Sequence, residues 1–514
     1  MNPKPSNNFL RRVLQRLLER LDRAEKRPPR SQKLSWLEME YHIPPWVIGV
    51  LSVVGLFGVL SWKEDFNFYQ YWAVGLFAIL SIALFGFYLV RDHPDIAKSD
   101  EATALTAVLF FLSLLWIYLV QFLAEHFRMI NLYGTPIGFG PLLVALLLNV
   151  RLAVIMSFVI ALFFGILSGY SLEITLLALV GNVTMVAVGH KARHTRHVFR
   201  AGLITGFVQV LIVLYLAVIR DWSQQYTWIS MLCAFMSGPI ASFFSLGTLP
   251  ILEGFFSRIS SLRLLELSDV NHSLLRKMSI EAPGTYHHSM IVATLAYEAA
   301  SSVGANALLC RVGAYFHDIG KMVKSEYFVE NQGTYGNPHD KVSPSLSRLI
   351  ITSHVKEGIA LGKSYKLEKQ ILDFIPQHHG TSQIEFFYQK ALKLEETEEE
   401  FDKEEVREDA FRYAGPKPQT KEAAIVMLAD SVEAASRTLE DPNHQRYEDM
   451  VYKIINKKLF DNQLNETPLT LKDLYKIANS FTNTLIALHH NRIPYPENNK
   501  TSPERKKDRL KPQK

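Results

Sequence analysis

The sequence predicts an all-α protein with two parts, a polytopic transmembrane helix bundle followed by a soluble, all-helical domain. Leu, Val, Ile, Phe, Ala and Gly dominate from about Pro45 to about Phe256, whereas the chain from about Ser257 onward has the charged composition of a soluble protein. Apolar residues in this second half recur at helical spacing, and no run alternates convincingly as a strand would. The two compositions therefore indicate two kinds of helical structure in one chain.

The expected order of domains follows from these changes in composition. We expect a cytoplasmic basic amphipathic segment over 1–44, the transmembrane bundle over 45–256, the soluble domain over 257–498 and a basic disordered tail over 499–514. The formal net charge is only +5, and Lys and Arg crowd both ends of the chain. This distribution suits loops that face a cytoplasmic membrane surface better than a nucleic-acid groove.

Cysteine usage and the first residues exclude several classes of protein. The two cysteines, Cys233 and Cys310, cannot form a disulfide framework or a cysteine-rich zinc site. The basic start is not followed by the short apolar core and cleavage site of a signal peptide. Phe9–Lys26 instead predicts a basic amphipathic helix, which either lies on anionic lipid or packs against the soluble domain of the same chain.

Eight apolar stretches approach the roughly 20 residues that a helix needs to cross the hydrocarbon core of a bilayer. They are Trp46–Trp62, Tyr71–Val90, Thr103–Ala124, Ile137–Val150, Leu152–Gly169, Leu172–Gly189, Ala201–Ile219 and Trp228–Pro250. The fourth and fifth are separated only by Arg151, so they form either a tight hairpin or one interrupted segment.

Lys and Arg in the loops predict the orientation, because cytoplasmic loops carry an excess of both. The N-terminus, the loop Arg91–Glu101, Arg151 and the loop His190–Arg200 are expected inside, and eight spans return the C-terminus to the same side. Asn182, Glu173 and His190 lie near span ends, where interfacial solvation explains them better than a role inside the membrane.

The helical period predicts a series of helices in the soluble half. They are Leu264–Val270, Met290–Val303, Leu308–Ile319, Pro344–Leu361, Leu367–Ile375, Lys421–Leu439, Tyr447–Leu459 and Leu471–His489. The acidic run Leu394–Asp409 indicates an exposed helix or a mobile excursion, because runs of like charge are usually solvated.

Histidine and aspartate form five clusters on these helices, mostly within or beside apolar sequence. They are residues 286–289, 316–321, 353–355, 377–380 and 428–431. A single buried histidine is usually a structural hydrogen-bonding residue. Five such clusters are harder to explain by packing, since burying each group is costly unless it is paired or bound to metal.

The residue types suit two divalent transition-metal ions. Imidazole and carboxylate favour manganese, iron or zinc, and seven ligands are too many for one tetrahedral site. His317 and Asp318 would point about 100° apart on a helix, so the carboxylate could bridge two ions. Two dications and two aspartates leave a net charge of about plus two, which attracts a phosphodiester and can promote its hydrolysis.

Longer stretches of the soluble half resemble the seven-transmembrane HD proteins, a family of bacterial cyclic di-AMP phosphodiesterases. The resemblance rests on residues 282–289, 312–321, 330–332, 337–340, 377–382, 411–413, 415–418, 427–437, 469–473 and 490–496. The resemblance implies an HD domain that hydrolyses a cyclic dinucleotide to the linear dinucleotide 5′-pApA, in the bacterial cell membrane with both termini in the cytoplasm.

The same resemblance implies roles for individual residues. His288, His317, Asp318 and Asp430 would hold one ion and His354, His378 and His379 the other, with Asp318 bridging and the ions being Mn²⁺ or Fe²⁺. His317, Asp318 and Lys321 would form the catalytic set, with Lys321 meeting a substrate phosphate, although a plain surface lysine is almost as good an interpretation of Lys321. His287 would lie behind the ligands, and Lys321, His339, Glu433 and Arg437 are candidates to contact substrate.

The sequence departs from the family pattern in one respect and leaves alternatives for the substrate and the class of protein. The family usually carries a large extracellular domain after its first span, and the loop Lys63–Gln70 is too short to hold one. Cyclic di-GMP is the alternative substrate, and a non-catalytic cyclic-dinucleotide receptor is the alternative class. The expected partners are the dinucleotide and the bilayer, with no nucleic-acid polymer. Homodimerisation through the HD domain is left open.

Overall fold

The computed structural model describes residues 68–97, 99–127, 131–332, 336–395, 406–440 and 442–488. The predicted N-terminal helix, the first predicted span Trp46–Trp62 and the basic tail lie outside these residues. Internal contacts divide the chain into two compact units, residues 1–108 and 109–514, which are described separately.

The described residues of the first unit form one long apolar helix, one short helix and the start of a second long helix. Helix α3 (Phe68–Asp92) contains the predicted span Tyr71–Val90, and α4 (Pro94–Ala97) leads into the start of α5 (Asp100–His126). Large apolar side chains on α3, such as Trp72 and Phe87, are more than 60% exposed. Apolar exposure along a whole helix indicates a surface that faces lipid.

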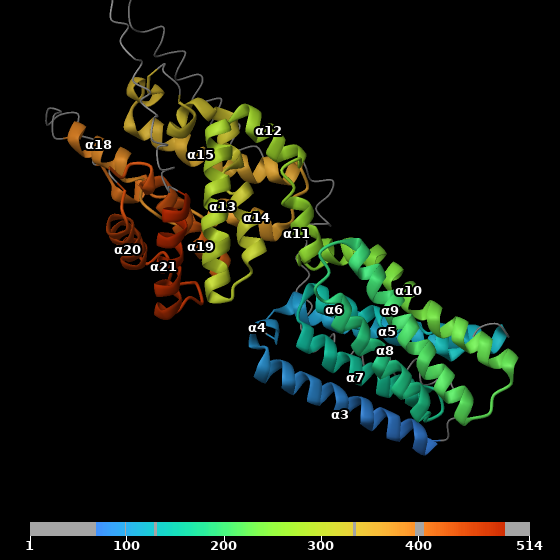
Figure 1. Cartoon of the computed structure of the whole chain (residues 1–514). Helices are drawn as coiled ribbons and strands as arrows, with labels where there is room; N and C mark the ends of the chain where they lie inside the picture. The colour runs from blue at the N-terminus through green and yellow to red at the C-terminus, as the bar shows by residue number, and fades with distance from the viewer. Residues whose placement is uncertain are drawn as a thin grey trace, which may run out of the picture. The chain divides into compact units, whose positions relative to one another are not determined.

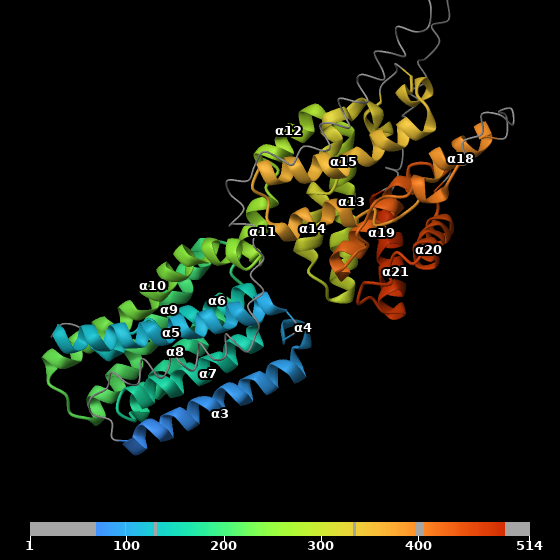
Figure 2. The same ribbon diagram turned by 180° about the vertical axis from the view of Figure 1, so that it is seen from behind.

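The apolar part of the second unit contains the rest of α5 and four further long helices. They are α7 (Val150–Leu167), α8 (Leu172–Gly189), α9 (Thr195–Ile219) and α10 (Gln224–Phe255). Figures 1 and 2 show α7, α8, α9 and α10 side by side, and consecutive helices are in contact. With α3 and α5, six described helices are long and apolar enough to cross a membrane.

Small and polar residues fix how these helices begin and pack. The side chains of Asn149, Ser171 and Ser223 accept hydrogen bonds from backbone N–H groups at the starts of α7, α8 and α10. Gly202 and Gly238 let the α9 and α10 backbones touch, because a Cβ on Gly238 would lie 2.1 Å from the Gly202 carbonyl oxygen.

The predicted span Ile137–Val150 differs from the structure. Its helix, α6 (Phe139–Leu147), has nine residues and follows a 3₁₀ turn, η2 (Leu132–Gly134), so it is too short to cross the hydrocarbon alone. Even so, Tyr133 contacts Trp222 in the loop between α9 and α10, while Leu142 lies beside Gly189 at the end of α8. The segment therefore runs between opposite ends of these helices as a broken helix, and such backbone is tolerated in a membrane when protein buries it.

The soluble half contains eleven described α-helices, of which the first begins at Ser261. They are α11 (Ser261–Leu267), α12 (Ser273–Glu281), α13 (Pro283–Val303), α14 (Ala307–Phe316), α15 (Pro344–Ser364), α16 (Lys369–Leu372), α17 (Phe374–Gln377), α18 (Glu385–Glu395), α19 (Lys421–Ser436), α20 (His444–Phe460) and α21 (Leu471–Leu488). Helix α13 packs against α14, α19 and α21 (Figures 1 and 2). Ala and Val residues such as Val292, Ala296, Val426 and Ala478 form the core between them.

The prediction of an all-α fold is confirmed, since the described residues contain only helices, turns and one isolated β-bridge between Gln383 and Arg412. Two details differ. Helices α12 and α18 were not predicted, and the predicted helix Leu367–Ile375 is two short helices, α16 and α17. Of the predicted acidic excursion, 396–405 lies outside the described residues and Glu408–Phe411 forms a 3₁₀ turn.

Candidate active site

Helices α13 and α14 place the first three candidate ligands. Helix α13 begins with a proline in its first turn, and its buried face carries His288. Helix α14 ends at Phe316, one turn earlier than predicted, so His317 and Asp318 stand at the break before the 3₁₀ segment η3 (Ile319–Tyr327). Both side chains are completely buried.

Gly320 brings this break against α15, the helix that carries His354. A Cβ on Gly320 would lie 1.8 Å from the carbonyl oxygen of His354 and 2.5 Å from the backbone nitrogen of Gly358. Only glycine allows the two backbones to approach so closely. The glycine that follows the His-Asp pair therefore sets the distance between Asp318 and His354.

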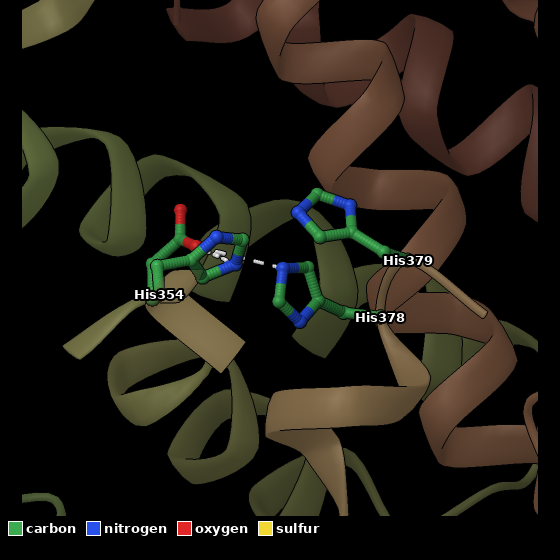
Figure 3. A group of neighbouring side chains, drawn as sticks. His354, His378 and His379 are labelled. Atoms are coloured by element: carbon green, nitrogen blue, oxygen red, sulfur yellow. Dashed lines mark ion pairs between the residues drawn. The ribbon is translucent and has the colours of Figure 1, made fainter. Parts of the chain in front are cut away.

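The remaining ligands come from α17 and α19. His378 and His379 follow the last residue of α17, and Gly380 then turns the chain with φ +55°. Asp430 lies in α19, among buried apolar residues. Figure 3 shows the rings of His378 and His379, from one segment, facing His354 from another.

The side chains form two groups that share one residue. His288, His317, Asp318 and Asp430 form one group, and Asp318, His354, His378 and His379 form the other. Within each group the candidate ligand atoms lie within 4.8 Å of one another. These are the two sets that the family resemblance implied, and the structure brings all seven predicted metal ligands together.

Asp318 has one carboxylate oxygen toward each group. Its Oδ2 lies 3.2 Å from Nε2 of His317 and 3.6 Å from Nε2 of His288. Its Oδ1 lies 3.5 Å from Nε2 of His354 and 3.5 Å from Nε2 of His378. A carboxylate placed in this way can bridge two cations.

Hydrogen bonds on the outer side of the imidazoles orient them toward this carboxylate. The Nδ1 atoms of His317, His354 and His378 lie 2.6, 2.6 and 3.1 Å from backbone carbonyl oxygens. A carbonyl can only accept, so each Nδ1 carries a proton and Nε2 is the ring atom left to bind a cation. This is the tautomer that binds metal through Nε2, held by the outer contact typical of such sites.

The inner atoms fit metal ions. Nε2 of His317, His354 and His378 and Oδ1 of Asp318 are buried and have no hydrogen-bond partner. Leaving so many polar atoms unsatisfied costs free energy unless a cation occupies the centre. The donor set of imidazole nitrogens and carboxylate oxygens, without sulfur, suits a divalent transition metal.

Electrostatics divide the histidines into two kinds. Burial lowers the pKa of His354 to about 4 and also lowers the pKa values of His378 and His379, which keeps these rings neutral and able to bind metal. Burial opposes protonation of His317 as well, but Asp318 and Asp430 outweigh it and raise its pKa to about 10. The field that favours a proton there equally favours a metal cation.

Lys321 forms ion pairs with two carboxylates at the centre. Its Nζ lies 2.6 Å from Oδ2 of Asp318 and 3.0 Å from Oε1 of Glu330. Burial opposes its charge, but these two carboxylates raise its pKa above the ordinary value. Lys321 is therefore a largely buried, protonated partner of the shared aspartate, and the alternative of a plain surface lysine is wrong.

Glu433 and Arg437 lie behind a ligand. Oε2 of Glu433 is 2.5 Å from Nδ1 of His288, and its Oε1 accepts from the Arg437 guanidinium at 2.7 Å. Glu433 is 1% exposed, and both residues are outside the lining of the neighbouring cavity. His287 is exposed, whereas His288 is buried, so the idea that His287 lies behind the ligands is wrong.

A cavity of about 380 Å³ adjoins the second ligand group. Aromatic side chains dominate its wall. Its lining is Lys321, Tyr327, Phe328, Val329, Glu330, Gln332, Asn337, His339, Ile351, His354, His379, Phe386, Phe387 and Tyr413. Of the predicted substrate contacts, Lys321 and His339 face this space.

Several residues around the centre received no role from the sequence. Glu330 holds Lys321, and the Tyr413 ring stacks on His379 with centroids 4.1 Å apart. Both lie in stretches that carry the family resemblance, which was the available signal. Their function depends on contacts between segments far apart in the chain, and spacing alone does not reveal these.

Comparison with known proteins identifies the family. A family model described as a 7TM receptor with intracellular HD hydrolase matches residues 68–260, and an HD domain model matches residues 285–435. The chain belongs to the seven-transmembrane HD family. The family match and the six apolar helices make it a multi-pass membrane protein, and the HD domain implies divalent-metal binding.

Two curated relatives match most of the chain. The "Cyclic-di-AMP phosphodiesterase PgpH" of Bacillus subtilis is 40% identical over 433 residues, which is 82% of this chain. The protein of the same name from Listeria monocytogenes is 34% identical over 437 residues, or 83% of this chain. The chain spans 59% of the length of each relative.

A solved structure matches the soluble half. The crystal structure of the HD domain of L. monocytogenes phosphodiesterase PgpH in complex with cyclic di-AMP is 44% identical. The alignment covers all of that chain and 44% of this one, with a TM-score of 0.40.

Proposed function

We propose that this protein is a membrane-bound, metal-dependent phosphodiesterase that hydrolyses cyclic di-AMP to the linear dinucleotide 5′-pApA. The single observation that carries the proposal is Asp318, whose two oxygens face two groups of buried imidazole and carboxylate ligands. The choice of cyclic di-AMP follows the names of the two curated relatives.

Each ligand has a defined task in this reaction. His288, His317, Asp318 and Asp430 hold one divalent ion and Asp318, His354, His378 and His379 hold the other, with Mn²⁺ or Fe²⁺ as the ions we propose. Two such ions supply Lewis-acid polarisation of the phosphodiester and lower the pKa of the attacking water. Water adds to phosphorus, the bond to the 3′ oxygen breaks, and that oxygen gains a proton, which leaves a 5′ phosphate.

Side chains around the two ligand groups fix the charge beside Asp318 and offer a surface for the substrate. Lys321 holds its proton because Asp318 and Glu330 face it, so it places a fixed positive charge beside the shared carboxylate. The aromatic cavity next to His354 and His379 offers ring faces on which a purine can stack. We propose that one nucleotide of the substrate occupies this cavity, with His339 as a contact.

Charge in one loop supports a cytoplasmic site. Lys191, Arg193, Arg196 and Arg200 lie between α8 and α9 or at the start of α9. Helices α9 and α10 are each long enough to cross a membrane, so the soluble half begins on the same side as this basic loop. Excess Lys and Arg mark the cytoplasmic side, and we place both the loop and the soluble domain there, in the bacterial cell membrane.

The test is hydrolysis of cyclic di-AMP and cyclic di-GMP by the purified full-length protein in detergent, with Mn²⁺ or Fe²⁺. A variant with His317→Ala and Asp318→Ala is the control. Conversion of cyclic di-AMP to 5′-pApA, lost in the control, is the expected result. Preference for cyclic di-GMP would overturn the substrate, and tight binding of metal and dinucleotide without cleavage would make the protein a receptor.

A further inference from the structure

A second lysine stands beside the centre, and the reaction proposed above gives it no role. Lys458 lies on α20, the helix that packs against the Asp430-bearing helix α19. It is half-buried, and its Nζ donates to Oγ of Ser382 at 2.8 Å. Ser382 follows His379 by three residues, and its backbone N–H donates to the His379 carbonyl.

Lys458 differs from its basic neighbours in its ion pairing. Lys457 pairs with Glu385, and Arg412 pairs with both Glu408 and Asp461. Among the described residues, no carboxylate lies within ion-pair distance of Lys458. Burial accordingly lowers the pKa of Lys458, while Asp430 and Asp461 act on its charge without contacting it.

The two lysines around the centre therefore differ in what they can offer a substrate. The ammonium of Lys321 already faces Asp318 and Glu330, which together carry two negative charges. Among the described residues, the ammonium of Lys458 has only a neutral hydroxyl as its partner, and that hydroxyl belongs to Ser382, whose backbone N–H donates to the carbonyl of His379. An anion that reached it would supply the missing countercharge in a partly desolvated place, where such pairing is strongest.

A cyclic dinucleotide has a second phosphate, which does not lie at the two ligand groups during the reaction. It carries two phosphodiesters, and only the one that is attacked can lie at the two ligand groups. We propose that Lys458 binds the second, uncleaved phosphate and so selects a substrate with two phosphodiesters. This inference rests on the proposed function and deepens it.

The experiment compares steady-state kinetics on cyclic di-AMP for the full-length protein and its Lys458→Gln, Lys458→Arg and Lys457→Gln variants. We expect Lys458→Gln to raise KM about tenfold, the loss of one charge-assisted contact, with kcat changed far less. Arginine keeps the charge and should restore most of the affinity. Lys457→Gln is the matched control, because Lys457 pairs with Glu385 and should leave KM unchanged.

Bis(4-nitrophenyl) phosphate, which has a single phosphodiester, separates substrate binding from a structural role. The rate of Lys458→Gln on this compound should fall much less than its kcat/KM for cyclic di-AMP. Equal losses on both substrates would mean that Lys458 only holds the loop at Ser382, and an unchanged KM would also overturn the inference. If the wild-type protein cleaves only bis(4-nitrophenyl) phosphate, the proposed function itself fails, and this inference fails with it.

Discussion

At the scale of single residues, the geometry of the site depends on hydrogen bonds made away from its centre. Backbone carbonyls hold the Nδ1 atoms of His317, His354 and His378, and these carbonyls exist whatever the neighbouring side chains are. His288 is different, because its Nδ1 faces the carboxylate of Glu433. A negative partner raises the basicity of an imidazole and therefore its strength as a ligand.

This difference leads to a prediction for Glu433→Gln. The amide keeps the size and one acceptor oxygen but loses the charge, so we expect metal affinity to fall about tenfold, within the range typical of such outer contacts. Titration of the metal-free protein with Mn²⁺ measures it. Glu448→Gln is the control, since Glu448 lies 3.9 Å from an exposed histidine, and equal affinities in the two variants would contradict the role of Glu433.

At the scale of elements, close backbone contacts decide which ligands meet. Gly320 lets the 3₁₀ segment after Asp318 touch α15, and Gly284 lets α13 approach the carbonyl of Glu330, where a Cβ would lie 1.8 Å from the oxygen. Both glycines stand in stretches that carried the family resemblance. The sequence marked them, but the backbone that each one faces comes from a distant segment.

Gly320→Ala tests this contact. The added methyl group must push η3 away from His354, at a cost of roughly 1–3 kcal/mol, which is typical of overpacking. We expect a lower thermal melting temperature with chelator present, together with weaker metal binding. Gly247→Ala in α10 is the comparison, because a Cβ there meets nothing within 4 Å. Matching behaviour of the two variants would show that the close approach is unimportant.

The broken helix between Asn131 and Asn149 shows where the pattern of apolar residues fails to predict an element correctly. Its residues are apolar, which led to the predicted span, yet α6 begins only after Pro136 and Gly138, ends at Leu147 and has nine residues. Most of the ring and aliphatic side chains in α6 and its approach are buried, including Ile137, Phe139 and Leu142. Hydropathy measures burial in an apolar medium, and it does not distinguish lipid from protein.

At the scale of the whole molecule, orientation is the property that can be tested directly. Gln225 at the start of α10 and Lys191 in the basic loop are both exposed, and α9 separates them. We expect a cysteine at Gln225 to react with a membrane-impermeant thiol reagent on intact cells, and one at Lys191 to react only after permeabilisation. Cys233→Ala and Cys310→Ala remove the native thiols. The reverse pattern would place the soluble half outside.

The sequence by itself determined the all-helical class, six of the eight predicted apolar spans and, through the family resemblance, the seven candidate ligands. Composition and period report burial along the chain, and unusual polar residues in apolar helices reveal a site before its shape is known. Only the tertiary structure decided that Asp318 faces both groups, that Glu433 lies behind His288, and that Lys321 pairs with two carboxylates while Lys458 has none within ion-pair distance among the described residues. Each of these depends on side chains from distant segments meeting in space, and such distances are set by packing, which no local pattern in the sequence contains.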